Sequence, residues 1–171
     1  MKFSSKKNQP VLEMDRSPQE AMLDLVAIAG IVASFVVVIT NWETLPDRIP
    51  THFDFAGNVN RFSPKNILWI FSLSSTFSFF LLKVISRYPH TFNYPIAITP
   101  ENAAVQYRLA LNMMYWLRAE MIWLFTLIQW QMIAVAKSPS DRFNSLVVFL
   151  LLVIVFCTVG VYLWRAWQAR S

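Results

Sequence analysis

The chain is divided into long apolar stretches separated by shorter polar ones. Four apolar stretches, residues 21–41, 66–86, 117–136 and 146–164, are long enough at 1.5 Å per residue for a helix to cross a hydrocarbon layer of about 30 Å. The pattern therefore predicts an all-α fold, an integral membrane bundle of four transmembrane helices. The loop between the first two helices, residues 42–65, is the main polar segment of the bundle.

That loop differs in composition from a simple linker. From Leu45 to Lys65 it holds three prolines, one glycine, one histidine, two aspartates, two arginines and a lysine, too many helix-breaking residues for a helix. Aromatic and polar residues alternate over residues 51–55, Gly57 suits a turn, and residues 59–62 form a return segment. We therefore expect a short β-hairpin in this loop.

Length and composition indicate one membrane domain. The 171 residues are 56% hydrophobic, with a mean hydropathy of +0.42, above the usual globular mix. Residues 1–16 are polar, lack periodicity and lack the features of a removable signal peptide, so they are predicted to be a disordered cytoplasmic tail. Residues 17–171 form the single domain. Because the third helical pattern begins near residue 100, its part over residues 100–116 is expected to extend beyond the bilayer on the cytoplasmic side.

Lysine and arginine residues are distributed unequally between the two ends of the predicted bundle. With the N-terminus inside, the inner side holds ten: Lys2, Lys6, Lys7, Arg16, Lys83, Arg87, Arg108, Arg118, Arg165 and Arg170. The outer side holds five: Arg48, Arg61, Lys65, Lys137 and Arg142. The positive-inside rule therefore places both termini in the cytoplasm and the 42–65 loop outside.

Other classes of function have no support in the sequence. The net charge of +5 is scattered, without the basic stripe or module of a nucleic-acid-binding protein. Cys157 is the one cysteine, so an internal disulfide is impossible. Glycine-rich phosphate loops, paired metal ligands and a nucleophile beside a histidine are all absent from the sequence. We therefore predict no catalytic residue, no metal and no cofactor, and a protein that is not an enzyme.

The outer loop also carries a recognisable motif: Leu45-Pro46, Ile49-Pro50, His52, Gly57, Arg61 and Lys65. In this motif the chain resembles a small bacterial membrane domain of unknown function that also forms the N-terminal part of SdpI-type immunity proteins. Later residues resemble the stand-alone four-helix members: Phe92-Asn93-Tyr94-Pro95, Ile98-Thr99-Pro100-Glu101-Asn102-Ala103 and Gln106-Tyr107. The resemblance implies a location in the bacterial cytoplasmic membrane. Family members often carry an acidic residue at the position of Asn60, and a Gly-Ser pair at Ser63-Pro64.

Candidate ligand or partner contacts gather in the outer loop. They are Arg48, His52, Asp54, Gly57, Arg61 and Lys65. His52 and Asp54 fall on one face of the predicted strand, where they either make structural hydrogen bonds or hold a cation. Two protein ligands are few for a cation, which favours the hydrogen bonds.

A second set of polar residues lies in or beside the membrane: Asp24, Asn112, Arg118, Glu120 and Gln129. Arg118 and Glu120 are two positions apart and so lie on nearly opposite sides of the helix, each needing its own partner. We expect Arg118 to extend to the membrane surface and Gln129 to hydrogen-bond to neighbouring helices. The residues serve either anchoring and pairing between helices, which is favoured, or an ion or proton site.

Two further sequence patterns indicate where helices begin and how they pack. Ser17 to Glu20 form a capping box at the start of the first helix, and Ser63-Pro64 are expected to begin the second. Serines at every third position of the second helix, Ser72, Ser75 and Ser78, favour close helix packing.

Three functions remain open. The first is a non-enzymatic immunity- or sensor-like membrane protein whose outer loop meets a peptide or another envelope ligand. The second is a structural or accessory subunit of a membrane complex, or a homo-oligomer, that uses the serine face and the stripe of Trp116, Trp123 and Trp130 as contacts. The third and weakest is a small transporter or intramembrane enzyme built on Asp24, Arg118, Glu120 and Gln129. The lipid bilayer is a partner in each case, and nucleic acid in none.

Overall fold

The computed structural model describes residues 9–138 and 142–170. The elements in chain order are α1 (Pro18–Asn41), η2 (Trp42–Thr44), β1 (Arg48–Phe53), β2 (Val59–Pro64), α2 (Ile67–Ile85), η3 (Pro89–Thr91), α3 (Ala103–Lys137) and α4 (Ser145–Gln168). Of the predicted tail, residues 1–8 lie outside the described residues, and residues 9–16 contain no helix or strand.

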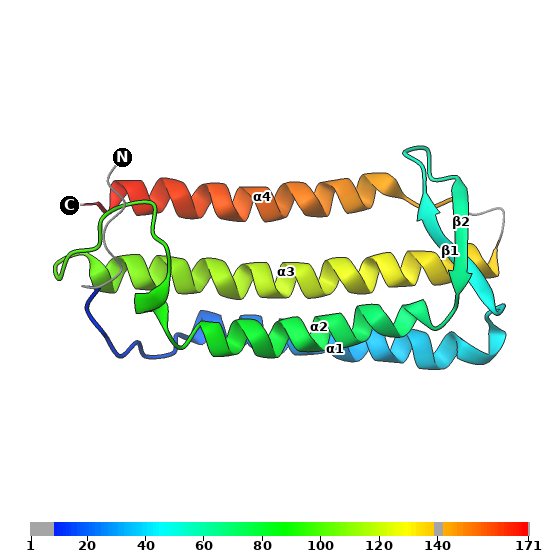
Figure 1. Cartoon of the computed structure of the whole chain (residues 1–171), viewed down its shortest axis with the longest axis horizontal. Coiled ribbons are helices and arrows are strands. Elements are labelled where there is room, and N and C mark those ends of the chain that lie inside the picture. The colour runs from blue at the N-terminus through cyan, green and yellow to red at the C-terminus, as the bar shows by residue number, and fades with distance from the viewer. Residues whose placement is uncertain (1–8, 139–141, 171) are drawn as a thin grey trace.

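The helices run side by side, with α3 between α4 on one side and the pair α1 and α2 on the other (Figure 1). The strands β1 and β2 form an antiparallel hairpin at one end of the bundle, while α1 begins and α4 ends at the other. Within residues 9–138 and 142–170, four helices are long and apolar enough to cross a membrane. The predicted helical fold with a hairpin between the first two helices is confirmed, and it indicates an integral membrane protein.

The starts of the first two helices differ in how well the sequence predicts them. Ser17 and Glu20 form the predicted reciprocal capping box of α1. The expected start of α2 at Ser63-Pro64 is wrong, because these residues belong to β2 and the helix begins at Ile67. Pro64 pairs with Arg48 at the end of a two-stranded ribbon, where a proline costs the ladder little because its missing N–H is at an edge.

Helices α1 and α3 approach closely around a glycine. A Cβ atom added at Gly30 would lie 2.8 Å from Ile122 Cγ2, and the Thr126 hydroxyl donates to the Gly30 carbonyl over 3.1 Å. In lipid, helix association depends on such close packing because the lipid tails are as apolar as the side chains. Gly30 is therefore where the shapes of α1 and α3 fit together.

A buried polar cluster joins three helices in the half of the bundle nearer the hairpin. Gln129 on α3 accepts from the Ser34 hydroxyl at 2.8 Å, and its amide donates to Ser72 Oγ at 3.0 Å and to the Leu68 carbonyl at 2.8 Å. Ser34 and Ser72 lie 2.6 Å apart, and all three polar side chains are 0% exposed. The predicted hydrogen bonds of Gln129 are confirmed, and so is the predicted packing role for Ser72 and Ser75, which are buried, whereas Ser78 is half-buried. Because Ser72 and Ser75 are buried between the helices of the bundle, the serine face of α2 is not a surface for another protein.

Replacing Gln129 with leucine is expected to lower the free energy of unfolding by about 1 to 3 kcal/mol, because it leaves buried polar groups without partners. Unfolding in detergent micelles, followed by tryptophan fluorescence, measures the change. The same substitution at the exposed Gln168 is the matched control and should have little effect. Equal stability of the Gln129 and Gln168 variants would show that the cluster contributes nothing.

Helix α4 packs mainly against α3 and leaves much of its apolar surface open. Tyr162 and Ala166 are its buried residues, whereas Phe156 and Trp164 are exposed. At the end near the termini, the Gln106 amide on α3 donates to the carbonyls of Ala166, at 3.1 Å, and Ala169, at 2.9 Å. The remaining apolar surface of α4 suits contact with lipid.

Candidate functional site

The hairpin turn is built around an aspartate and a glycine. Asp54 accepts hydrogen bonds from the amide of Asn58 at 2.8 Å and from its side chain at 2.9 Å. These bonds, the side-chain one most strongly, hold the pKa of Asp54 below its usual value because they favour the charged form. Gly57 follows with a φ of 81°, a conformation that glycine adopts without strain. The turn is thus set by local hydrogen bonds, so Asp54 has a structural role.

The same glycine attaches the hairpin to the segment before α4. The Gly57 carbonyl accepts from the amide of Phe143 at 3.2 Å, and the rings of Phe53 and Phe143 stack with centroids 4.3 Å apart. A Cβ atom at Gly57 would lie 2.2 Å from the Phe143 carbonyl oxygen. The hairpin therefore lies against the connection between α3 and α4, with glycine required at the contact.

Lys65 fixes the base of the hairpin. Its ammonium donates to the carbonyls of Trp42, at 3.1 Å, and Leu45, at 3.2 Å. It also lies 4.9 Å from the centre of the Trp42 ring, a favourable position for a cation. Lys65 thus joins the ends of α1 and β2 and does not face a ligand site.

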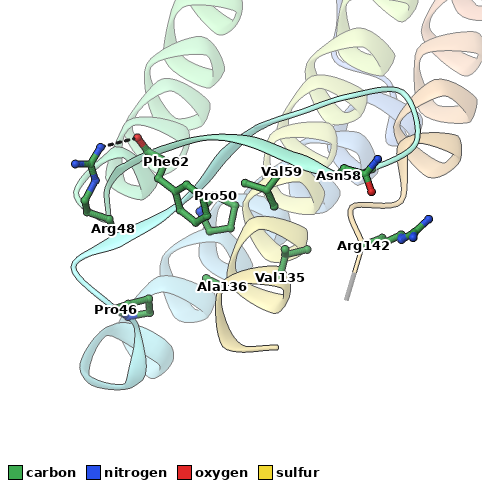
Figure 2. Close-up of a pocket in the computed structure, with 10 residues that line it drawn as sticks. Pro46, Arg48, Pro50, Asn58, Val59, Phe62, Val135, Ala136 and Arg142 are labelled. Atoms are coloured by element: carbon green, nitrogen blue, oxygen red, sulfur yellow. Dashed lines mark hydrogen bonds between the residues drawn. The ribbon is translucent and has the colours of Figure 1, made fainter. Parts of the chain in front are cut away.

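A cavity of about 620 Å³ lies between the hairpin and the end of α3. Figure 2 shows Arg48 and Arg142 on opposite sides of it. The residues between them are mainly apolar: Pro46, Pro50, Val59, Phe62, Val135 and Ala136. Gly57 and Asn58 complete the lining. Its size and its apolar floor with few polar groups are typical of a site for a small or extended ligand.

The cavity carries positive charge at its rim. Arg48 donates to the Phe62 carbonyl at 3.1 Å, which uses one of its five N–H donors. Neither Arg48 nor Arg142 forms an ion pair with any of the described residues. Two guanidinium groups are therefore free to meet an anionic group that enters the cavity.

The other predicted loop residues lie away from this cavity. His52 Nδ1 donates to Asn60 Oδ1 over 2.5 Å, and His52 pairs across the hairpin with Arg61. Both side chains are exposed. In the described part of the chain, no three His, Cys, Asp or Glu side chains gather where they could hold a metal ion. Of the six predicted loop residues, Arg48 and Gly57 line the cavity.

Arg142 was not among the candidates from sequence, although it lines the cavity. It lies 78 positions after Pro64, where the hairpin ends, and no motif marks it. The one feature of the sequence that could have indicated Arg142 is its place among the five lysine and arginine residues expected on the outer side of the membrane.

A cluster of three charged side chains lies at the end of the bundle near the termini. Asp24 on α1 binds Arg118 on α3 through one carboxylate oxygen and Arg16 through the other. The guanidinium of Arg118 lies 4.4 Å from the Tyr115 ring centre and 4.9 Å from that of Phe79. Arg118 is 1% exposed, so the expectation that it extends to the surface is wrong. The partner on α1 holds it inside the bundle instead.

Glu120 faces the opposite side of α3, as predicted from its spacing to Arg118. Its carboxylate accepts from the Thr158 hydroxyl on α4 at 2.6 Å. Asn112 and Glu120 line a groove of about 440 Å³ between α3 and α4. The predicted polar residues thus lie in three separate places: the Asp24–Arg118 ion pair, the cluster around Gln129, and the contact of Glu120 with Thr158. Among the described residues they do not form one transport or catalytic site.

The fold and site define a class: a four-span membrane protein whose first two helices are joined by a docked hairpin. A family model for a domain of unknown function (DUF1648) matches residues 29–82. That range covers the second half of α1, the hairpin and most of α2, and it includes the Leu45 to Lys65 motif. No curated protein and no solved structure matches the chain.

Proposed function

We propose that this chain is a non-enzymatic, immunity- or sensor-like protein of the bacterial cytoplasmic membrane whose hairpin end binds a ligand. The observation that carries the proposal is the cavity under the hairpin, with Arg48 and Arg142 at its rim and an apolar floor. The sequence resemblance to immunity proteins of the SdpI type supports it, since those proteins answer a toxic peptide at the membrane.

The excess of lysine and arginine at the end with the termini supports an orientation with both termini in the cytoplasm. The hairpin and its cavity then face the outside. A ligand arriving from the cell envelope reaches the cavity without crossing the bilayer.

The chemistry of the cavity favours an amphipathic peptide with a carboxylate. Guanidinium groups bind carboxylates through paired hydrogen bonds, and the floor formed by Pro50, Phe62 and Val135 suits apolar side chains. A peptide of this kind is drawn to the membrane surface by its apolar residues. The cavity would then bind it at the level where it arrives.

Replacing Arg48 or Arg142 with glutamine is expected to weaken binding of such a peptide by about 10- to 100-fold, the effect of losing a charge-assisted hydrogen bond. The measurement uses a host without the gene, complemented with each variant and exposed to a panel of envelope-active peptides. Survival at graded peptide concentrations gives the loss of protection.

Arg61→Gln is the matched control, because Arg61 is an exposed arginine of the same hairpin that does not line the cavity. Membrane abundance of each variant, measured by immunoblot, separates loss of binding from loss of protein. Full protection by the Arg48→Gln, Arg142→Gln double variant would refute the cavity as the ligand site.

An accessory subunit of a larger membrane complex is the second candidate, favoured by α4. Its apolar side chains, including Phe149, Phe156 and Trp164, are exposed along the helix, and Trp116 and Trp130 on α3 are exposed as well. A partner helix could cover this surface instead of lipid. Purification in mild detergent separates the two candidates: a stable larger assembly favours the subunit, whereas a lone chain or homodimer favours the sensor.

A further inference from the structure

Another cavity, of about 490 Å³, lies at the end of the bundle remote from the hairpin. Its walls come from residues 11–16, the start of α1, the end of α2 with the loop that follows, and α3. Two hydrogen bonds hold the segment before α1 in place: the Tyr107 hydroxyl donates to the Pro10 carbonyl at 2.9 Å, and the Gln9 amide donates to the Phe92 carbonyl at 3.4 Å. The cavity is therefore walled by segments that are distant in the sequence.

Most of the acidic groups in this cavity already have partners. Asp24 binds both Arg16 and Arg118. Glu20 binds Arg108 at 2.9 Å and accepts from the Ser17 amide at 3.1 Å. These two carboxylates are thus neutralised within the chain, so neither demands a cation from a ligand.

Three charged groups remain for a ligand. Lys83 and Arg87 line the α2 side of the cavity and Glu13 lines the side of the N-terminal segment. None of them forms an ion pair within residues 9–138 and 142–170. Lys83 contacts the Phe79 ring, 5.5 Å from its centre, which leaves its ammonium N–H groups available. The cavity therefore presents two cations and one carboxylate that have no ion-pair partner among the described residues.

We propose that this cavity binds the headgroup of an aminophospholipid, with the phosphate at Lys83 and Arg87 and the ammonium at Glu13. The positions of Lys83 and Glu13 along the membrane normal fit the phosphate and the ammonium of such a lipid. Lys83 is in the last turn of α2, a helix long enough to end at the headgroup layer. Glu13 is in the segment that precedes α1, outside the span, and the flexible ethanolamine arm of such a lipid lets its ammonium reach this level.

This site is separate from the hairpin cavity and does not depend on which end of the bundle faces the cytoplasm. A phosphatidylcholine headgroup has the phosphate but no N–H donor for Glu13. A phosphatidylglycerol headgroup has the phosphate but no cation. Both lipids test the Glu13 half of the site: the first lacks the N–H donors and the second lacks the cation. The phosphate half is tested by changing Lys83 and Arg87.

The experiment measures lipid retention by native mass spectrometry of the full chain, purified in mild detergent and titrated with each lipid. The unaltered protein should retain phosphatidylethanolamine about tenfold more strongly than phosphatidylcholine, the effect of one charge-assisted hydrogen bond. Glu13→Gln should remove most of that preference. The Lys83→Gln, Arg87→Gln double variant should lower retention of all three lipids.

Lys137→Gln, a change at the hairpin end of α3 that lines neither cavity, is the control and should leave retention unchanged. Size-exclusion chromatography of each variant checks that the protein is folded. Equal retention of phosphatidylethanolamine and phosphatidylcholine by the unaltered protein, or an unchanged preference in Glu13→Gln, would overturn the proposal. Displacement of the lipid by soluble phosphoethanolamine at equal concentration would overturn the lipid as the source of the headgroup.

Discussion

Replacing Asp24 with alanine is expected to lower the free energy of unfolding by about 3 to 5 kcal/mol, the usual cost of removing one member of a buried ion pair. The change leaves the guanidinium of Arg118, 1% exposed, without a counter-charge inside the bundle. Denaturant titration in detergent micelles, followed by far-UV circular dichroism, measures the loss.

Two further variants separate charge burial from loss of packing. Arg16→Gln removes the other partner of Asp24. Because the Arg16 side chain is 52% exposed, this change should lower the free energy of unfolding by no more than about 1 kcal/mol, as for surface ion pairs. The Asp24→Ala, Arg118→Leu double variant should recover most of the stability, because it removes both charges together. A double variant less stable than Asp24→Ala would contradict the argument.

Replacing Gly57 with alanine is expected to detach the turn of the hairpin from the segment before α4. The left-handed backbone alone costs a residue with a Cβ atom about 1 to 2 kcal/mol. The added carbon would also lie 2.2 Å from the Phe143 carbonyl oxygen, so the two backbones must separate. Hydrogen exchange followed by mass spectrometry should show faster exchange in β1, β2 and the first turn of α4.

Gly160→Ala is the matched control, because nothing lies within 4 Å of a Cβ atom added there. In the middle of α4 this substitution should stabilise the helix by up to about 1 kcal/mol. Hydrogen exchange in the hairpin should not change. Unaltered exchange in the Gly57→Ala variant would show that the hairpin is held by other contacts.

Much of the fold follows from local patterns in the sequence. The apolar stretches determine where the helices lie, because lipid demands a continuous run of such residues. The hairpin follows from the alternation near Phe53 and the glycine at position 57. The start of α2 was predicted wrongly since Ser63-Pro64 suits a helix start as well as a strand end, and only the pairing of Pro64 with Arg48 decides between them.

The candidate site depends on contacts between distant segments, which the sequence pattern does not give. Spacing predicted that Arg118 and Glu120 need separate partners, but not that these are Asp24 and Thr158 on other helices. Arg142 joins the hairpin cavity because Phe143 beside it contacts Gly57. Periodicity indicates which face of a helix is polar; which helix packs against that face is decided by three-dimensional shape.

The way α4 is attached has a mechanical consequence. One end is tied to the hairpin through Phe143 and Gly57, and the other is tied to α3 through the hydrogen bonds of Gln106. Between these two anchors the Thr158 hydroxyl donates to Glu120 on α3, and the remaining sides of α4 are apolar and exposed. A displacement of the hairpin would therefore act on α4 first through Phe143, and would reach the contact of Thr158 with Glu120 before the carbonyls of Ala166 and Ala169 at the opposite end of the bundle.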